Sequence, residues 1–129
     1  MILANLASRL RVLEIGTGLG VSTRALASRA KSVVTVDPDP WVVAPDLPNV
    51  TLLREPPDDC SAFDLAFIDG NHCVDAVVGD IRLCSRIPKL VLHDTDMQDV
   101  QDAIRQCGLR LVEDYRTACS MARFTHARR

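Results

Sequence analysis

The sequence predicts an α/β fold in which residues 1–129 form a single domain around a mostly parallel, doubly wound sheet. Apolar, β-branched segments alternate with segments of helical periodicity, which is typical of a parallel sheet covered by helices on both faces. A chain of 129 residues has room for one core. A hydrophobic content of 47% and a charged content of 25% are ordinary for a globular protein.

The centre of the predicted sheet is the segment 12–15, a largely apolar run that indicates a strand buried on both faces. A short helix is expected before it, because apolar residues recur there at helical spacing: Ile2, Leu3, Leu6 and Leu10. A second helix is expected after it, extending to about Ala30. Ser22 and Thr23 can cap the N-terminus of that second helix.

Three alternating glycines, Gly16, Gly18 and Gly20, connect this strand to the second helix. They allow a tight turn in which the backbone can approach a ligand closely, because no Cβ blocks it. A strand, a glycine turn and a helix N-terminus together form a site for a small polar ligand.

The next predicted strand, 32–37, is β-branched and ends in Asp37, seventeen residues after Gly20. An α/β nucleotide-binding fold places there the carboxylate that holds two ribose hydroxyls. Alternatively, Asp37 is a turn residue before Pro38, and the two roles are compatible.

The middle of the chain is rich in proline. Residues 41–44 can begin a short helix, limited by Pro45 and Pro48, and Trp41 either packs in the core, which we favour, or edges an adenine pocket. Residues 49–54 are expected to form a third strand. The gap between Arg54 and the next strand is too short for a helix and two turns, so the crossover is expected to be a loop over residues 55–61.

The second half continues the alternation. Residues 63–69 predict a fourth strand, and a helix with one apolar stripe follows and stops before Pro88; the stripe is Val74, Val77, Val78, Ile81 and Cys84. Residues 90–94 predict a fifth strand, and another helix over 100–107 is expected to end at Gly108. The segments 109–112 and 118–124 are expected to form an antiparallel hairpin.

Net charge, apolar runs and cysteine usage argue against several classes of protein. A net charge of −2 provides no general attraction to nucleic acid, and the basic C-terminal residues suggest a solvated tail rather than a phosphate patch: Arg116, Arg123, His126, Arg128 and Arg129. No apolar run approaches the ~20 residues of a membrane span, and Arg9 argues against a signal peptide, so a cytoplasmic location is expected.

Five cysteines without a Cys-x-x-Cys pair argue against a disulfide framework or structural zinc. Cys73 and Cys84 are expected to be small buried hydrophobes.

Polar residues follow every central strand of the predicted sheet. In such sheets ligands bind beyond the carboxyl ends of the strands. If the fourth and fifth strands pair, Asp69, His93 and Asp94 converge beside the glycine turn, since neighbouring strands lie ~4.8 Å apart. Two carboxylates with an imidazole suit a divalent cation such as Mg²⁺. The alternative is that both acids cap the helices that follow them.

The first motif, Glu14-x-Gly16-x-Gly18-x-Gly20, resembles motif I of class I S-adenosylmethionine-dependent methyltransferases. A dinucleotide fingerprint would require a small residue at 21, where the chain has Val21. A nicotinamide-dependent oxidoreductase is therefore disfavoured.

Two further stretches, 67–72 (Phe-Ile-Asp-Gly-Asn-His, with Asp80 eight residues on) and 91–95 (Val-Leu-His-Asp-Thr), are similar to metal-dependent O-methyltransferases of sugars and other small hydroxylated metabolites. The resemblance implies a Rossmann-like, seven-stranded sheet of order 3-2-1-4-5-7-6 with strand 7 antiparallel. It implies that Asp69 and Asp94 bind metal together with His93, and that His72, as the general base, and Asp69 are the catalytic residues. It also implies a set of cofactor contacts: Glu14, Gly16, Thr17, Gly18, Gly20, Asp37 and Asp69.

The sequence departs from that family in three places. Val74 stands where an aromatic is common, and residues 87–89 replace a Gly-Gly turn. The N-terminal helices that cover the substrate are absent, since ten residues precede the first strand, so a partner chain or a second copy could supply them. We expect S-adenosylmethionine-dependent O-methylation of a small hydroxylated molecule with Mg²⁺. The alternative is a reduced cofactor-binding module that is inactive or needs a partner chain.

Overall fold

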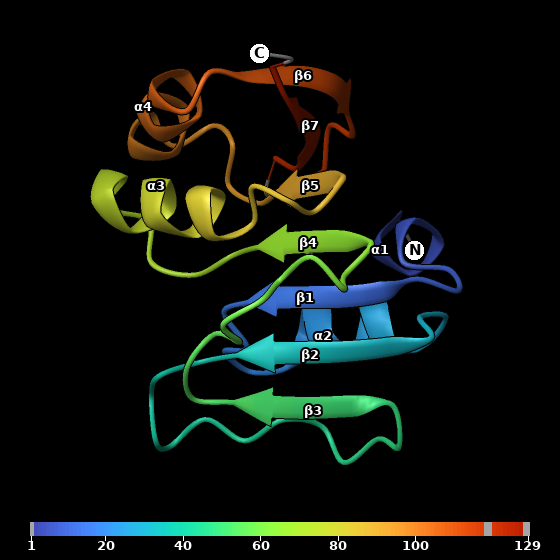
Figure 1. Cartoon of the computed structure of the whole chain (residues 1–129). Helices are drawn as coiled ribbons and strands as arrows, with labels where there is room; N and C mark the ends of the chain where they lie inside the picture. The colour runs from blue at the N-terminus through green and yellow to red at the C-terminus, as the bar shows by residue number, and fades with distance from the viewer. Residues whose placement is uncertain (1, 118–119, 128–129) are drawn as a thin grey trace.

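A computed structural model describes residues 2–117 and 120–127, which form one seven-stranded sheet with helices on both faces (Figure 1). The strands are β1 (Arg11–Ile15), β2 (Ser32–Val36), β3 (Val50–Leu53), β4 (Leu65–Ile68), β5 (Lys89–Leu92), β6 (Leu109–Asp114) and β7 (Ala122–His126). The helices are α1 (Ile2–Leu6), α2 (Val21–Ala27), α3 (Val74–Leu83) and α4 (Gln98–Gln106).

The strand order is β3-β2-β1-β4-β5-β7-β6, which confirms the predicted order. The five strands from β3 to β5 are parallel, whereas β7 is antiparallel to both β5 and β6. The direction of β7 follows from its short connection to β6, since a parallel pair would need a long crossover. Because β1 runs parallel to both β2 and β4, the carboxyl ends of these three strands lie at the same end of the sheet.

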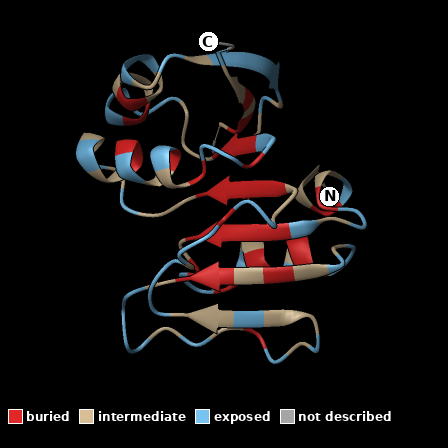
Figure 2. Cartoon of the chain, in the orientation of Figure 1, coloured by how far each residue is buried: buried red, intermediate tan, exposed pale blue. Residues whose placement is uncertain are grey.

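The core consists of two apolar layers, one on each face of the sheet. The central strands between them are largely buried (Figure 2). Successive side chains of a strand point to opposite faces. In β4, Leu65 and Phe67 pack in the layer that contains Leu26 of α2, and Ala66 and Ile68 pack in the layer beneath α3 and α4. The predicted stripe of α3 faces that second layer through its buried members Val77, Val78 and Ile81.

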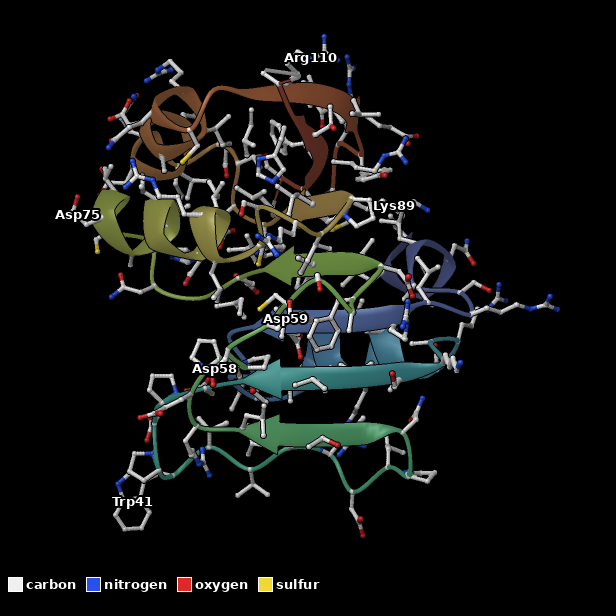
Figure 3. The ribbon with its side chains drawn as sticks, viewed as in Figure 1. Trp41, Asp58, Asp59, Asp75, Lys89 and Arg110 are labelled. Carbon is white, nitrogen blue, oxygen red and sulfur yellow. The ribbon has the colours of Figure 1, made fainter. Side chains whose placement is uncertain are left out.

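The two connections that flank β3 contain no helix. The loop over 55–61 was predicted, but the short helix expected at 41–44 does not form, because prolines interrupt this stretch. Trp41 projects from the loop into solvent with 89% of its surface exposed, so its predicted core packing was wrong (Figure 3). Without a helix here, the indole has no apolar face to cover.

Several boundaries differ from the prediction. Strand β7 begins at Ala122, and residues 118 and 119 of the strand expected there lie outside the described part of the chain. Arg123 and His126 belong to β7, so only the end of the basic segment could be a tail, and Arg128 and Arg129 are also outside the described residues.

The cysteines divide into buried and accessible ones. Cys84 is buried as expected, but Cys73 is exposed at the N-cap of α3. Cys119 lies outside the described residues, and the four described cysteines are free: Cys60, Cys73, Cys84 and Cys107. Of the helices that the structure describes, none has the length and apolar character needed to cross a membrane.

Candidate functional site

The glycine turn after β1 touches the backbone that follows β4. Gly16 has a φ of 97°, and a Cβ placed on it would lie 2.1 Å from the carbonyl oxygen of Asp69. No side chain fits in that space, so glycine is required where these two strand ends meet. Gly18 also has a positive φ, of 50°, but a Cβ there would meet no atom within 4 Å. The turn thus presents an open face at Gly18 for a ligand.

Glu14 is completely buried beneath the first turn of α2. It accepts hydrogen bonds from Oγ of Ser22 at 2.6 Å and from Oγ1 of Thr23 at 2.5 Å. The prediction that these two hydroxyls cap α2 was wrong, because the N-cap is Gly20 and the hydroxyls turn to the carboxylate below. Burial raises the pKa of Glu14, and the hydroxyl donors partly offset this. Glu14 therefore ties β1 to α2 and supports the glycine turn from below.

Asp37, directly after β2, holds the glycine turn from the other side. Its Oδ2 accepts the backbone N–H groups of Thr17 and Gly18, both at 3.1 Å. Its Oδ1 accepts the N–H of Asp39 at 3.1 Å. The sequence predicted that Asp37 binds a ligand or belongs to the turn before Pro38. The structure adds that its carboxylate also orders the glycine turn.

Two cavities meet at the glycine turn. The first, of about 530 Å³, lies on the α3 side and has five polar lining residues beside the glycines: Asp37, Arg54, Asp69, Asn71 and Asp80. Its apolar lining comes from Ile15, Val36, Pro38, Pro56 and Ala76. The second, of about 420 Å³, lies on the α2 side and includes Leu3, Leu19, Val21, Phe67 and His93. Gly16, Gly18 and Asp69 line both cavities, and these volumes are typical of small-molecule sites.

Arg54, which we did not predict as a site residue, orders the wall of the first cavity. Its guanidinium donates to the carbonyl oxygens of Asp39 at 2.5 Å and of Val42 at 2.8 Å. The signal in the sequence was that Arg54 ends the third predicted strand, and ligands bind beyond the carboxyl ends of such strands. In the structure Leu53 pairs with Val36, so Arg54 emerges next to Asp37. Arg54 therefore fixes the conformation of the proline-rich loop after β2, where no helix forms.

The acidic residues after β4 and β5 meet two histidines. Ile68 pairs with Leu92 in the sheet, which places the residues that follow them side by side. Nδ1 of His93 lies 3.2 Å from Oδ1 of Asp69 and 3.1 Å from Oδ2 of Asp94. Nε2 of His72 lies 3.0 Å from Oδ2 of Asp94 and 3.6 Å from Oδ1 of Asp69. We call these four residues the acid–histidine cluster.

The acid–histidine cluster has the donor set of a cation site. The ligand atoms of Asp69, His93 and Asp94 all lie within 4.8 Å of one another. Nε2 of His72 and Nδ1 of His93 are buried, and among the described residues neither has a partner with hydrogen-bond geometry, despite the short distances to the carboxylates. Two carboxylates and an imidazole fit a divalent ion such as Mg²⁺ or Mn²⁺.

Backbone conformation and charge also mark this cluster. Asp94 has a φ of 50°, a left-handed conformation that is uncommon outside glycine and concentrates at functional sites. Burial raises the pKa of Asp69, an effect that His93 opposes and Asp94 reinforces. The alternative that Asp69 and Asp94 cap helices finds no support, since the N-caps of α3 and α4 are Cys73 and Met97.

Asp80 is a further acid in the first cavity whose role we did not predict. It is partly buried on α3, and burial raises its pKa to about 6. A signal was present in the sequence, because Asp80 lies three residues after Val77 and four before Cys84, within the apolar stripe of the helix. An acid at such a position faces the protein rather than the solvent.

Comparison with known proteins provides a structural match only. No model of a protein family matches the sequence, and no curated protein matches it. Ribosomal protein L11 methylase from Lactobacillus delbrueckii subsp. bulgaricus is 17% identical with a TM-score of 0.68, over 98% of this chain and 77% of that one. N-methyltransferase NodS from Bradyrhizobium japonicum WM9, in complex with S-adenosyl-L-homocysteine, is 18% identical with a TM-score of 0.67, over 98% and 83%.

A SAM-dependent O-methyltransferase from Thermotoga maritima is 14% identical with a TM-score of 0.67, over 99% of this chain and 64% of that one. These proteins act on different kinds of acceptor, so the likeness concerns the architecture. The seven strands of this chain also follow the order that the methyltransferase resemblance implied. The chain therefore has the fold of the class I S-adenosylmethionine-dependent methyltransferases.

Proposed function

We propose that this chain is an S-adenosylmethionine-dependent methyltransferase that methylates a hydroxyl group of a small molecule, with a divalent metal such as Mg²⁺ and with His72 as the base. The observation that carries the proposal is the position of the acid–histidine cluster. Its Asp69 lines both cavities and its His93 lines the second, next to the glycine turn, so one cavity can hold the cofactor and the other the acceptor.

The first cavity suits the cofactor. Gly18 opens onto it, and Asp37 lines it from the end of β2. A carboxylate has about four lone-pair directions, and the N–H groups of Thr17, Gly18 and Asp39 use three of them. One direction on Oδ1 is left, which suits one ribose hydroxyl. Glu14, buried under α2, acts indirectly by supporting the turn.

The acid–histidine cluster suits oxygen chemistry. A divalent cation bound by Asp69, Asp94 and His93 would lower the pKa of an acceptor hydroxyl. His72, whose Nε2 lacks a hydrogen-bond partner among the described residues, is free to take the hydroxyl proton. Asp94, 3.0 Å from that nitrogen, then stabilises the imidazolium that forms. The acceptor oxygen would attack the methyl carbon in line with its bond to the sulfonium sulfur, so that a C–O bond forms as the C–S bond breaks and S-adenosylhomocysteine leaves. Alignment with exclusion of water would supply most of the acceleration.

The test has two stages on the purified full chain. Calorimetry with S-adenosylmethionine and with S-adenosylhomocysteine measures binding, and NAD is the control ligand. Formation of S-adenosylhomocysteine is then followed with a panel of sugars, catechols and other hydroxylated small molecules, with Mg²⁺ or with a chelator. We expect binding of both sulfur nucleosides and metal-dependent turnover of at least one acceptor.

Three outcomes would count against the proposal. Binding of NAD without the sulfur nucleosides would exclude the methyltransferase class. Cofactor binding without turnover of any acceptor would favour a reduced cofactor-binding module. Turnover that is unaffected by a chelator would remove the metal from the mechanism.

A further inference from the structure

The first cavity contains one carboxylate that the proposed function does not use. Asp80 lines it from α3, and its Oδ2 would lie 3.5 Å from a Cβ placed on Gly70. The carboxylate is therefore next to the backbone that follows β4, on the inner side of the helix. Asp75 belongs to the same helix, but it is exposed at its outer end (Figure 3).

The other polar side chains of this cavity already have partners. Asp37 accepts N–H groups of the glycine turn. Arg54, the one cationic residue in the lining, donates to carbonyl oxygens of the loop after β2. Oδ1 of Asn71 accepts the N–H of Cys73 at 2.9 Å. Asp69 belongs to the acid–histidine cluster.

Asp80 differs from all of them. Burial is the one influence on its pKa, and no donor or cation among the described residues offsets it. A partly buried carboxylate without a partner is costly to the protein unless a ligand supplies a hydrogen-bond donor. A ligand bound in this cavity can therefore present an N–H or O–H group to Asp80.

The walls around Asp80 indicate what kind of donor this is. Ile15, Val36, Pro38, Pro56 and Ala76 give the cavity an apolar lining that suits the faces of a planar ring. Asp37 lines the cavity from the end of β2 and binds the ribose under the proposed function. Asp80 lines the cavity from α3. A purine in this slot can meet Asp80 with one polar edge.

We propose that Asp80 accepts a hydrogen bond from the 6-amino group of the cofactor's adenine and so selects adenine over a 6-oxo purine. The inference rests on the proposed function, because it assumes that the first cavity holds the nucleoside. It assigns Asp80 as a specificity-determining residue that takes no part in methyl transfer.

The test compares two nucleosides on the purified full chain by calorimetry. S-adenosylhomocysteine carries the 6-amino group, and S-inosylhomocysteine carries a 6-oxo group in its place. We expect the wild-type chain to bind the adenine compound at least about tenfold more tightly, because the 6-oxo group places an acceptor against an acceptor. Asp80→Asn should erase or reverse this preference, since a carboxamide can donate to the 6-oxo group. Asp75→Asn, on the same helix but exposed, should keep the wild-type ratio.

A second probe separates the base from the amino-acid end of the cofactor. Methylthioadenosine retains adenine but lacks the ammonium group. If Asp80 bound the ammonium instead, Asp80→Asn would weaken S-adenosylhomocysteine and leave methylthioadenosine unchanged, and that result would overturn the inference. We expect both compounds to weaken by a similar factor.

Failures of the inference and of the proposed function are distinguishable. A wild-type chain that binds neither nucleoside refutes the proposed function itself. A wild-type chain that binds both equally, or an Asp80→Asn variant with the wild-type ratio, refutes the role of Asp80 alone. Thermal unfolding checks that the variant is folded, and Asp80→Ser provides a second variant with a smaller side chain.

Discussion

Gly16 and Asp69 are in backbone contact across two neighbouring strands, so close that a Cβ on the glycine would lie 2.1 Å from the aspartate carbonyl oxygen. The contact joins the glycine turn to the acid–histidine cluster. A change in one is therefore transmitted directly to the other, and the position of Asp69 depends on a residue that carries no functional group.

Gly16→Ala is expected to destabilise the fold by about 3 kcal/mol, from overpacking against backbone atoms and from the left-handed φ. It should also weaken binding of S-adenosylhomocysteine. Gly18→Ala is the matched control, because it has a positive φ but open space around the added Cβ, and it should cost about 1 kcal/mol. Urea unfolding measures both, and equal effects of the two variants would contradict the steric explanation.

Asp37→Ala removes the acceptor for two backbone N–H groups of the glycine turn. We expect binding of S-adenosylhomocysteine to weaken by about 1.5–3 kcal/mol, the range for hydrogen bonds to a charged group. Calorimetry compares this variant with Asp46→Ala, an exposed acid in the following loop. Unchanged affinity in Asp37→Ala would remove Asp37 from the cofactor site.

Asp80 should give the stability of the protein a distinct pH dependence. Its pKa rises from 3.8 to about 6 in the folded state, so the folded protein binds more protons than the unfolded one between these values. The stability contributed by this group is therefore present at low pH and is lost as the pH rises through about 6.

Asp80→Asn should remove that component, so its free energy of unfolding should exceed that of the wild type at pH 7 but not at pH 4. Because the carboxyl group is partly exposed, solvent screening limits the gain to about 1 kcal/mol. Urea unfolding at both pH values measures it, with Asp75→Asn as the exposed control. A variant that gains the same stability at both pH values would show that the effect is not due to ionisation.

Variants of His72 and Asp69 should distinguish the loss of the general base from the loss of metal binding. His72→Ala is expected to leave cofactor and metal affinity intact and to slow methyl transfer by about 10²–10⁴. Asp69→Asn keeps the shape of the side chain but removes a charged ligand, so it should lower Mg²⁺ affinity and turnover together. Asp96→Asn, an exposed acid two residues after Asp94, is the control. Full activity of both variants would place the chemistry elsewhere.

The sequence was enough for most of the architecture, although the helix expected at 41–44 does not form. Strands and helices were predictable because their periodicities, 2 and about 3.6 residues, are local properties of the chain. The loop at 55–61 was predictable because the available length excludes a helix there. The resemblance to methyltransferase motifs supplied the strand order, which the structure confirms. The positions of Gly16, Asp37, Asp69 and Asp94 at strand ends followed from the same patterns.

The partners of the side chains were decided by the tertiary structure. Ser22 and Thr23 bond to Glu14 rather than capping α2, because β1 places a buried carboxylate beneath them. Arg54 reaches the loop after β2 because β3 pairs with β2, and Trp41 is exposed because no helix forms between those strands. Periodicity determines which face of an element is buried, whereas the group that a polar atom meets depends on which elements become neighbours, and that is decided by packing through space.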